Sequence, residues 1–167
     1  AKDPSGVDSN LLENTSLEDW TNGKALPWEF DAGTNTLVTF FQETAIVKDG
    51  SRAVKVDNPA GGTTVNIAQS YSDGLSTGDK YELSFDYYVV SGDNSDARIW
   101  SGWKSFNGVS YADIKHDWGE LRHGGVGVPG YLSSKYGEWS NYRTETTVPE
   151  GAAMFDFRVR TYRGSVV

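Results

Sequence analysis

The residues best suited to bind a ligand are aromatic, and many of them lie in one stretch of the chain. The sequence contains six tryptophans and nine tyrosines. The stretch from Arg98 to Trp139 contributes Trp100, Trp103, Tyr111, Trp118, Tyr131, Tyr136 and Trp139. Flat aromatic rings stack on the apolar faces of sugar rings, and neighbouring polar side chains hydrogen-bond the hydroxyl groups. Six tryptophans exceed the usual need of a core this size, so we expect some at the surface.

Strand alternation predicts which polar residues join these aromatic rings. Apolar residues alternate with Asp86 and Tyr88 in Tyr81–Val90, and with charged residues in Met154–Tyr162. Because successive side chains of a strand point to opposite faces, we expect one sheet face to carry the charges and the aromatic rings. The predicted ligand-binding residues are Trp100, Trp103, Arg98, Arg158, Arg160, Tyr162, Asp86, Trp118, Tyr131 and Gln69.

A purely structural role is the alternative for each of these residues. Two tryptophans, Trp28 and Trp139, flank strands near apolar residues, and packing is the favoured interpretation for them. Packing and exposure stay equally open for the tryptophans in the predicted binding set. The two arginines of the last long strand could also serve only as charge partners of Asp86 and Asp156.

Enzymatic interpretations find little support. His116 and His123 are seven residues apart, which is not the i, i+4 spacing of a helical zinc pair, and no serine lies in a G-x-S-x-G motif. The glycines at 125, 127 and 130 match a dinucleotide-binding pattern only by accident, because Pro129 interrupts it. Asp113, Asp117 and Glu120 are the nearest carboxylate cluster for glycoside hydrolysis, whose geometry is spatial. We therefore expect a non-catalytic protein.

Composition narrows the class of partner. The 167 residues carry a formal charge of −8 and no cysteine, so an acidic chain that repels phosphate backbones is not expected to bind nucleic acid. No apolar run approaches the length of a membrane span. We predict a flexible lead-in over residues 1–10 and a single monomeric domain over residues 11–167.

Short alternating segments separated by turn residues predict an all-β fold. The expected strands are Trp28–Phe30, Thr36–Phe41, Ala45–Val47, Ala53–Val56, Thr63–Ser70, Tyr81–Val90, Ala97–Trp103, Trp139–Val148 and Met154–Tyr162. Residues 104–135 are rich in glycine and are expected to be mostly long loops. Val166 and Val167 begin a further strand. This pattern indicates an antiparallel β-sandwich or jelly roll with two sheets.

Several motifs occur in a recognisable order along almost the whole chain. They are Asn10–Asn14 with Leu17, Glu18 and Trp20; Gly50–Val56; Ile67–Gln69 with Thr77–Phe85; and the closing segments Trp139–Gly151 and Phe155–Tyr162. Together they resemble the carbohydrate-binding modules of the family 4, 9 and 22 type, which have a galactose-binding-like jelly roll. The segment Arg98–Trp103 is most similar to modules found in xylanases of gut Bacteroidetes.

The resemblance carries further expectations. It implies xylan or a related plant cell-wall β-glycan as ligand, a covalently linked glycoside hydrolase as partner, and an extracellular or cell-surface location. It also implies a structural calcium ion, held by Glu18 with the carbonyl groups of Gly50 and Arg52, and a final strand that is truncated or missing here. The rival interpretations are a structural or cell-surface interaction domain on the same fold, and a glycoside hydrolase.

Overall fold

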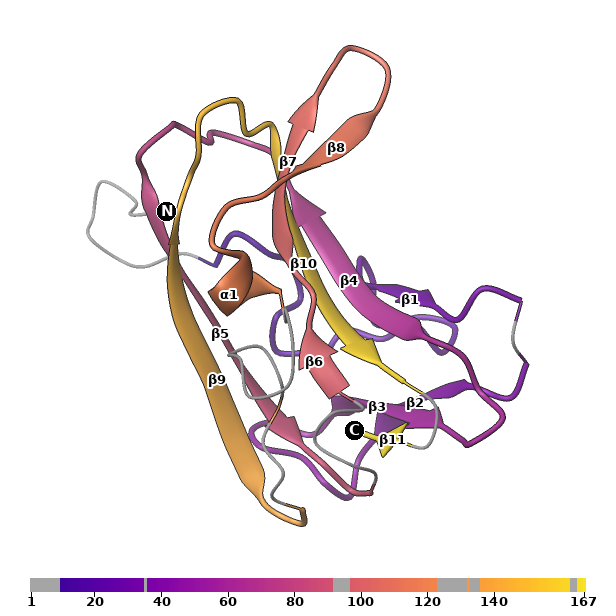
Figure 1. The fold of residues 1–167 in the computed structure, drawn as a ribbon. Coiled ribbons are helices and arrows are strands. Elements are labelled where there is room, and N and C mark those ends of the chain that lie inside the picture. Colours follow the sequence, from indigo (N-terminus) through magenta and orange to yellow (C-terminus); the bar gives the residue numbers. More distant parts are fainter. Residues whose placement is uncertain (1–9, 35, 92–96, 123–131, 133–135, 163–164) are drawn as a thin grey trace.

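The strands follow the alternation of apolar and polar residues along the chain. The computed structural model describes residues 10–34, 36–91, 97–122, 132, 136–162 and 165–167. Within them the elements are β1 (Glu29–Asp31), β2 (Thr39–Glu43), β3 (Ala53–Asn58), β4 (Val65–Tyr71), β5 (Lys80–Tyr88), β6 (Ala97–Ile99), β7 (Gly102–Phe106), β8 (Tyr111–Ile114), α1 (Trp118–Leu121), β9 (Trp139–Thr147), β10 (Met154–Thr161) and β11 (Ser165–Val166). All strand pairs are antiparallel, so the predicted all-β sandwich is confirmed (Figure 1).

One layer is a six-stranded sheet in the order β1-β4-β10-β7-β8, with β6 also paired to β10. β6 and β7 occupy successive parts of the same edge of β10. Between them, the Trp100 N–H donates to the carbonyl of Arg158 (2.8 Å) and the Ser101 hydroxyl accepts from the Arg158 N–H (2.8 Å). The single strand predicted over Ala97–Trp103 is therefore two short strands.

The second layer consists of two smaller sheets. β5 pairs with β9 along its whole length, and β3 pairs with β2 and β11. The apolar faces of the two layers meet in the core, where Leu83 from β5 and Phe157 from β10 are buried. Phe85 packs edge-on against Phe157, with ring centres 5.6 Å apart. The face predicted to be apolar in Tyr81–Val90 is thus the core face of β5.

Two sequence predictions about elements are wrong. Residues 45–47 form no strand, because the Glu43 carboxylate accepts hydrogen bonds from the backbone N–H groups of Thr44 (2.9 Å) and Ala45 (2.7 Å) and turns the chain there. The expected long loops of residues 104–135 contain most of β7, β8 and α1 in their described part. The β7–β8 turn is closed by Asn107, whose side-chain oxygen accepts from the N–H groups of Val109 (3.0 Å) and Ser110 (2.9 Å). This hairpin projects beyond the rest of the sandwich (Figure 1).

β11 pairs with β3 next to the described C-terminal residue, Val167, whose backbone exchanges hydrogen bonds with Val56. The predicted lead-in lies outside the described residues, apart from Asn10. In the described part of the chain no helix is long and apolar enough to span a membrane.

Candidate ligand-binding face

The outward face of the six-stranded sheet carries most of the predicted binding residues. Register places Arg160 of β10 opposite Arg98 of β6, and Asp156 opposite Gly102 of β7. Alternation turns these side chains away from Phe157, which is buried in the core. The same reasoning places Lys104 and Asp113, which are opposite each other on β7 and β8, on this outward face.

Seven side chains on this face alternate between cation and aromatic ring. We call them the cation–aromatic row: Arg98, Tyr162, Arg160, Trp100, Arg122, Trp118 and Lys115. Cations are attracted to the negative face of an aromatic ring, by about 0.5–2 kcal/mol per contact depending on exposure. Each cation in the row therefore contacts an aromatic ring, and each ring contacts cations.

The first half of the row comes from β6 and β10. The guanidinium carbon of Arg98 lies 4.2 Å from the ring centre of Tyr162. Arg160 is hydrogen-bonded to Tyr162 and lies over the ring of Trp100 at 4.1 Å. The Nε of Arg160 also donates to the side-chain oxygen of Asn66 on β4 (3.1 Å). Burial is the main cause that lowers the pKa of Arg160, and the neighbouring cations Arg158 and Arg122 lower it further, against the opposing effect of Tyr162.

The second half of the row comes from α1 and its flanks. The guanidinium carbon of Arg122 lies 5.2 Å from the ring centre of Trp100 and 4.6 Å from that of Trp118. The ammonium of Lys115 lies 5.4 Å from the Trp118 ring. Trp118 and Arg122 are four residues apart, which places them on the same side of a helical turn. Both lie against Gly102, where a Cβ atom would lie 3.3 Å from the Arg122 guanidinium and 3.8 Å from the Trp118 indole nitrogen.

Two carboxylates pair with cations in the row or beside it. Asp156 is 5% exposed and pairs with Lys104 (3.3 Å) and Arg158 (3.0 Å). Asp113 pairs with Arg122 (2.8 Å) and Lys104 (3.4 Å). The hydrogen bond from Arg122 is the largest cause that keeps the pKa of Asp113 below its ordinary value. The lowered pKa makes Asp113 unsuited to the role of general acid in a glycosidase, which requires a protonated carboxyl group.

Asp117 and Glu120, the other two members of the predicted carboxylate cluster, make their contacts with β9 instead of with Asp113. The Asp117 carboxylate accepts hydrogen bonds from the Thr146 hydroxyl (2.9 Å) and the Thr147 N–H (3.4 Å) on β9. The carbonyl of Glu120 accepts from the Tyr142 hydroxyl, and burial followed by the charge of Glu120 raises the pKa of Tyr142 to about 12. These contacts fix α1 against β9 and thereby position Trp118.

An exposed aromatic pair extends the face onto the β7–β8 hairpin. Phe106 is 49% exposed and Tyr111 is 48% exposed, and their ring centres are 4.9 Å apart. Alternation places Phe106 on the same side of β7 as Lys104. This pair offers the open ring surface that a sugar can stack on, whereas Trp100 is in contact with two guanidinium groups.

Three predicted binding residues lie elsewhere. Trp103 is 1% exposed and its indole N–H donates to Thr146 in the core (2.9 Å). Trp103 and Trp100 are three residues apart in an extended chain, so they face opposite sides of the sheet. The amide of Gln69 is buried and is hydrogen-bonded to both backbone groups of Glu13. Asp86 is on the outward face of the other layer, where it accepts from Asn141 (3.1 Å). The expectation that these three line one binding face is wrong.

The other tryptophans follow the packing interpretation in part. Trp28 is buried, and its indole N–H donates to the carbonyl of Asn14 (2.9 Å). Trp139 is half-buried on the outward side of β9, edge-on to Tyr88. Tyr131 lies outside the described residues. Of the predicted set, the structure thus brings together Arg98, Trp100, Trp118, Arg158, Arg160 and Tyr162.

Sequence reasoning missed Lys104, Phe106 and Arg122. The first two share a side of β7 with Gly102, but this part of the chain was interpreted as loop. Arg122 follows Trp118 by four residues in the short segment WGEL-R, and that spacing is the signal that could have identified it. Asp113 was noted only as a candidate catalytic acid.

The predicted calcium ligands are neighbours in the structure. The Glu18 carboxylate accepts hydrogen bonds from the N–H of Ser51 (2.8 Å), the hydroxyl of Ser51 (2.7 Å) and the N–H of Arg52 (3.0 Å). Gly50 has φ 73° and approaches Glu18 so closely that a side chain would overlap the carboxylate. Among the described residues, no three His, Cys, Asp or Glu side chains gather in a way that could hold a metal ion. Calcium stays a prediction, and hydrogen bonds account for the position of Glu18.

A hollow in the described chain is separate from this face. It is a cleft of about 960 Å³ whose lining includes Val54 of β3, Phe85 of β5 and Phe157 of β10. These side chains belong to the core or pack against it. The lining also includes side chains on the outward side of β5 and β9, such as Asp86, Tyr88 and Trp139, and it contains none of the row.

Comparison with known proteins relates the chain to others through its fold. No protein-family model and no curated protein matches the sequence. The enzymatically active domain of tailspike protein 4 of bacteriophage CBA120 has a TM-score of 0.62 at 17% identity, over 94% of this chain but only 20% of that one. The carbohydrate-binding module TmCBM61, solved with β-1,4-galactotriose, has a TM-score of 0.53 at 15% identity, over 95% and 92% of the two chains. A CBM4 structure has a TM-score of 0.48 at 13% identity, over 92% and 91%. The β-sandwich fold of the chain is thus similar to that of TmCBM61.

Proposed function

We propose that this chain is a non-catalytic carbohydrate-binding module that binds polysaccharide on the outward face of its six-stranded sheet. The observation that carries the proposal is the cation–aromatic row, which continues toward the exposed pair Phe106 and Tyr111. The row supplies hydrogen-bond donors and the pair supplies open rings, and sugar recognition uses both. The fold shared with TmCBM61, which was solved with a galactotriose, supports the same class of function.

The finer points of the proposal concern ligand and context. The ligand is a plant cell-wall β-glycan, with xylan as the first candidate. The module is secreted, is part of a larger glycoside hydrolase, and raises the local concentration of that enzyme on its substrate. The ion pairs of Asp113 and Asp156 support a binding role over hydrolysis, because each carboxylate is held by cations.

Calorimetric titration tests the proposal. Xylohexaose, cellohexaose, mannohexaose and β-1,4-galactotriose are titrated into the wild type, Trp100→Ala and Trp139→Ala. Trp139 is the matched control, because it is a half-buried tryptophan on the outward side of the other layer. We expect at least one glycan to bind, and Trp100→Ala to weaken it about fivefold, because Arg160 and Arg122 are positioned by this ring through contacts that each contribute on the order of 1 kcal/mol. Trp139→Ala should bind like the wild type.

The rival functions give different results in the same set of measurements. A structural or interaction domain would show no heat with any glycan, or equal binding by both variants. A hydrolase would release reducing sugar from xylan, and this release would depend on Asp113 or Asp156. Either result would contradict the proposed function.

A further inference from the structure

Among the described residues, the charge on the binding face is opposite to the formal charge of the whole chain. The row and its ion-pair partners contain six cations, Arg98, Lys104, Lys115, Arg122, Arg158 and Arg160, and two carboxylates, Asp113 and Asp156. The complete sequence has a formal charge of −8. Two more carboxylates on this face, Glu29 and Asp31, lie on β1 at the edge of the sheet, two strands away from β10. Cations are therefore concentrated at the centre of the face.

Among the described residues, the two carboxylates do not balance the five cations Lys104, Lys115, Arg122, Arg158 and Arg160, even with Arg98 left out of the count. Asp156 and Asp113 share three cations between them: Lys104, Arg122 and Arg158. Arg160 contacts three neutral groups: the amide oxygen of Asn66, the ring of Trp100 and the side chain of Tyr162. Its charged neighbours Arg158 and Arg122 are of the same sign, and they lower its pKa. An anion beside Arg160 would relieve this repulsion.

The aromatic rings of the row are less open to sugar stacking than their number indicates. Guanidinium groups lie over Trp100 at 4.1 Å and 5.2 Å, and over Trp118 at 4.6 Å. The Arg122 side chain is 10% exposed, so this packing is well inside the surface. Recognition at the centre of the face thus depends on charge and hydrogen bonds more than on ring stacking.

We infer that the polysaccharide bound by this face is acidic, with carboxylate groups on its sugar rings that contact Arg160, Arg98 and Arg158. This inference rests on the proposed function. The guanidinium group presents a planar fork of N–H donors that fits a carboxylate, and such charge-assisted hydrogen bonds are about twice as strong as neutral ones. A xylan with uronic acid side groups meets both this requirement and the proposed ligand class. Nucleic acid is the other polyanion that a cationic face attracts, and the oligonucleotide control below tests it.

The test compares each acidic polymer with its own neutral form. Glucuronoxylan, polygalacturonate and alginate are titrated before and after chemical reduction of their carboxyl groups, which leaves the backbone intact. We expect the acidic form of at least one polymer to bind about tenfold or more tightly than its reduced form at about 50 mM NaCl, and the difference to shrink at about 500 mM. Dextran sulfate and a single-stranded oligonucleotide are the polyanion controls, and both should bind more weakly.

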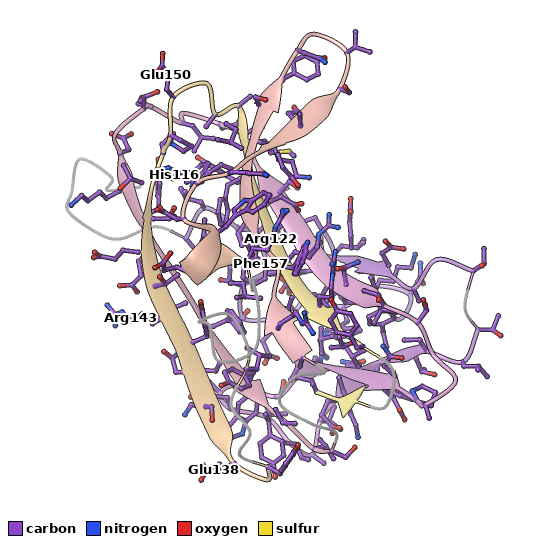
Figure 2. All side chains as sticks on the ribbon, viewed as in Figure 1. His116, Arg122, Glu138, Arg143, Glu150 and Phe157 are labelled. Atoms are coloured by element: carbon purple, nitrogen blue, oxygen red, sulfur yellow. The ribbon has the colours of Figure 1, made fainter. Side chains whose placement is uncertain are left out.

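Variants connect the effect to the arginines. Arg160→Gln and, independently, Arg98→Gln should remove most of the difference between acidic and reduced forms. Arg143→Gln is the matched control: Arg143 pairs with Glu82 and projects from β9 away from the sandwich, on the other side from Arg122 (Figure 2). Melting temperatures of all three establish that they fold.

Three results would overturn the inference. If a reduced polymer or a neutral hexaose binds as tightly as the acidic forms, the proposed function stands and the acidic ligand is wrong. If dextran sulfate or the oligonucleotide binds as tightly as the best acidic glycan, the face recognises charge without the carboxylate geometry. If no glycan of either kind binds, the proposed function fails together with the inference.

Discussion

At the scale of single residues, Trp100 and Trp103 show how the direction of a side chain along a strand decides between a binding role and a core role. The two tryptophans are close in sequence and both had been expected to contact ligand. Trp103 faces the core with its indole N–H bonded to Thr146, and Trp100 faces outward between two arginines. Their odd spacing already implies opposite faces, so parity was a stronger signal here than residue type.

Trp103→Ala is expected to destabilise the protein. The substitution removes a fully buried aromatic side chain that packs against Phe155, with ring centres 4.8 Å apart. Loss of a buried Trp in a core costs about 3–5 kcal/mol, and urea unfolding measures it. Trp100→Ala is the comparison and should cost clearly less, because Trp100 is half-buried. Equal losses in the two variants would contradict the assignment of Trp103 to the core.

Asp113 makes the stability of the folded protein depend on pH in the acidic range. Its pKa in the folded state lies below the ordinary value of 3.8, mainly because Arg122 donates a hydrogen bond to it. A depressed pKa stabilises the folded state above the unfolded pKa, and this contribution disappears as the pH falls through the folded value. Asp113→Asn should therefore lower the melting temperature at about pH 7, and the difference between the two proteins should shrink as the pH falls below 3.8. A constant difference across this range would contradict this role of Asp113.

At the scale of elements, the binding face depends on how short segments are held in place. Asp117 connects the start of α1 to β9 through Thr146, the same residue that accepts the Trp103 indole N–H. Asn107 closes the β7–β8 hairpin that carries Phe106 and Tyr111. Both anchors are single polar side chains in turns. Glycine-rich composition suggested loops here, because the sequence pattern does not reveal which polar residue will close a turn.

Glu18 likewise holds two segments of the chain together through hydrogen bonds. It accepts three hydrogen bonds from Ser51 and Arg52, and the hydroxyl of Ser51 is the largest cause that lowers its pKa. Glu18→Gln should lower the melting temperature by a similar amount with calcium and with EDTA, because these bonds need no metal. An effect of the substitution only in the presence of calcium would instead assign Glu18 to a calcium site.

At the scale of the whole molecule, alternation was sufficient to predict the fold but not the pairing of faces. The segments that became β5, β9 and β10 were identified to within a few residues, because their apolar residues repeat every second position. Asp86 shows the limit: its side of β5 was correct, yet β5 belongs to the other layer. Which strands become neighbours is decided by contacts between distant segments, and the local alternation of apolar and polar residues does not specify those contacts.

The location of the ligand on one face is the claim that a single measurement tests most directly. The six tryptophans give separate indole N–H signals in a nitrogen-15 spectrum, and single Trp→Phe variants assign them. The indole groups of Trp20, Trp28 and Trp103 already donate to protein oxygens. We predict that the best acidic glycan from the titrations shifts the signals of Trp100 and Trp118 and leaves those of Trp28, Trp103 and Trp139 in place. A shift of Trp139 with Trp100 and Trp118 unchanged would place the ligand on the other layer and contradict the proposed binding face.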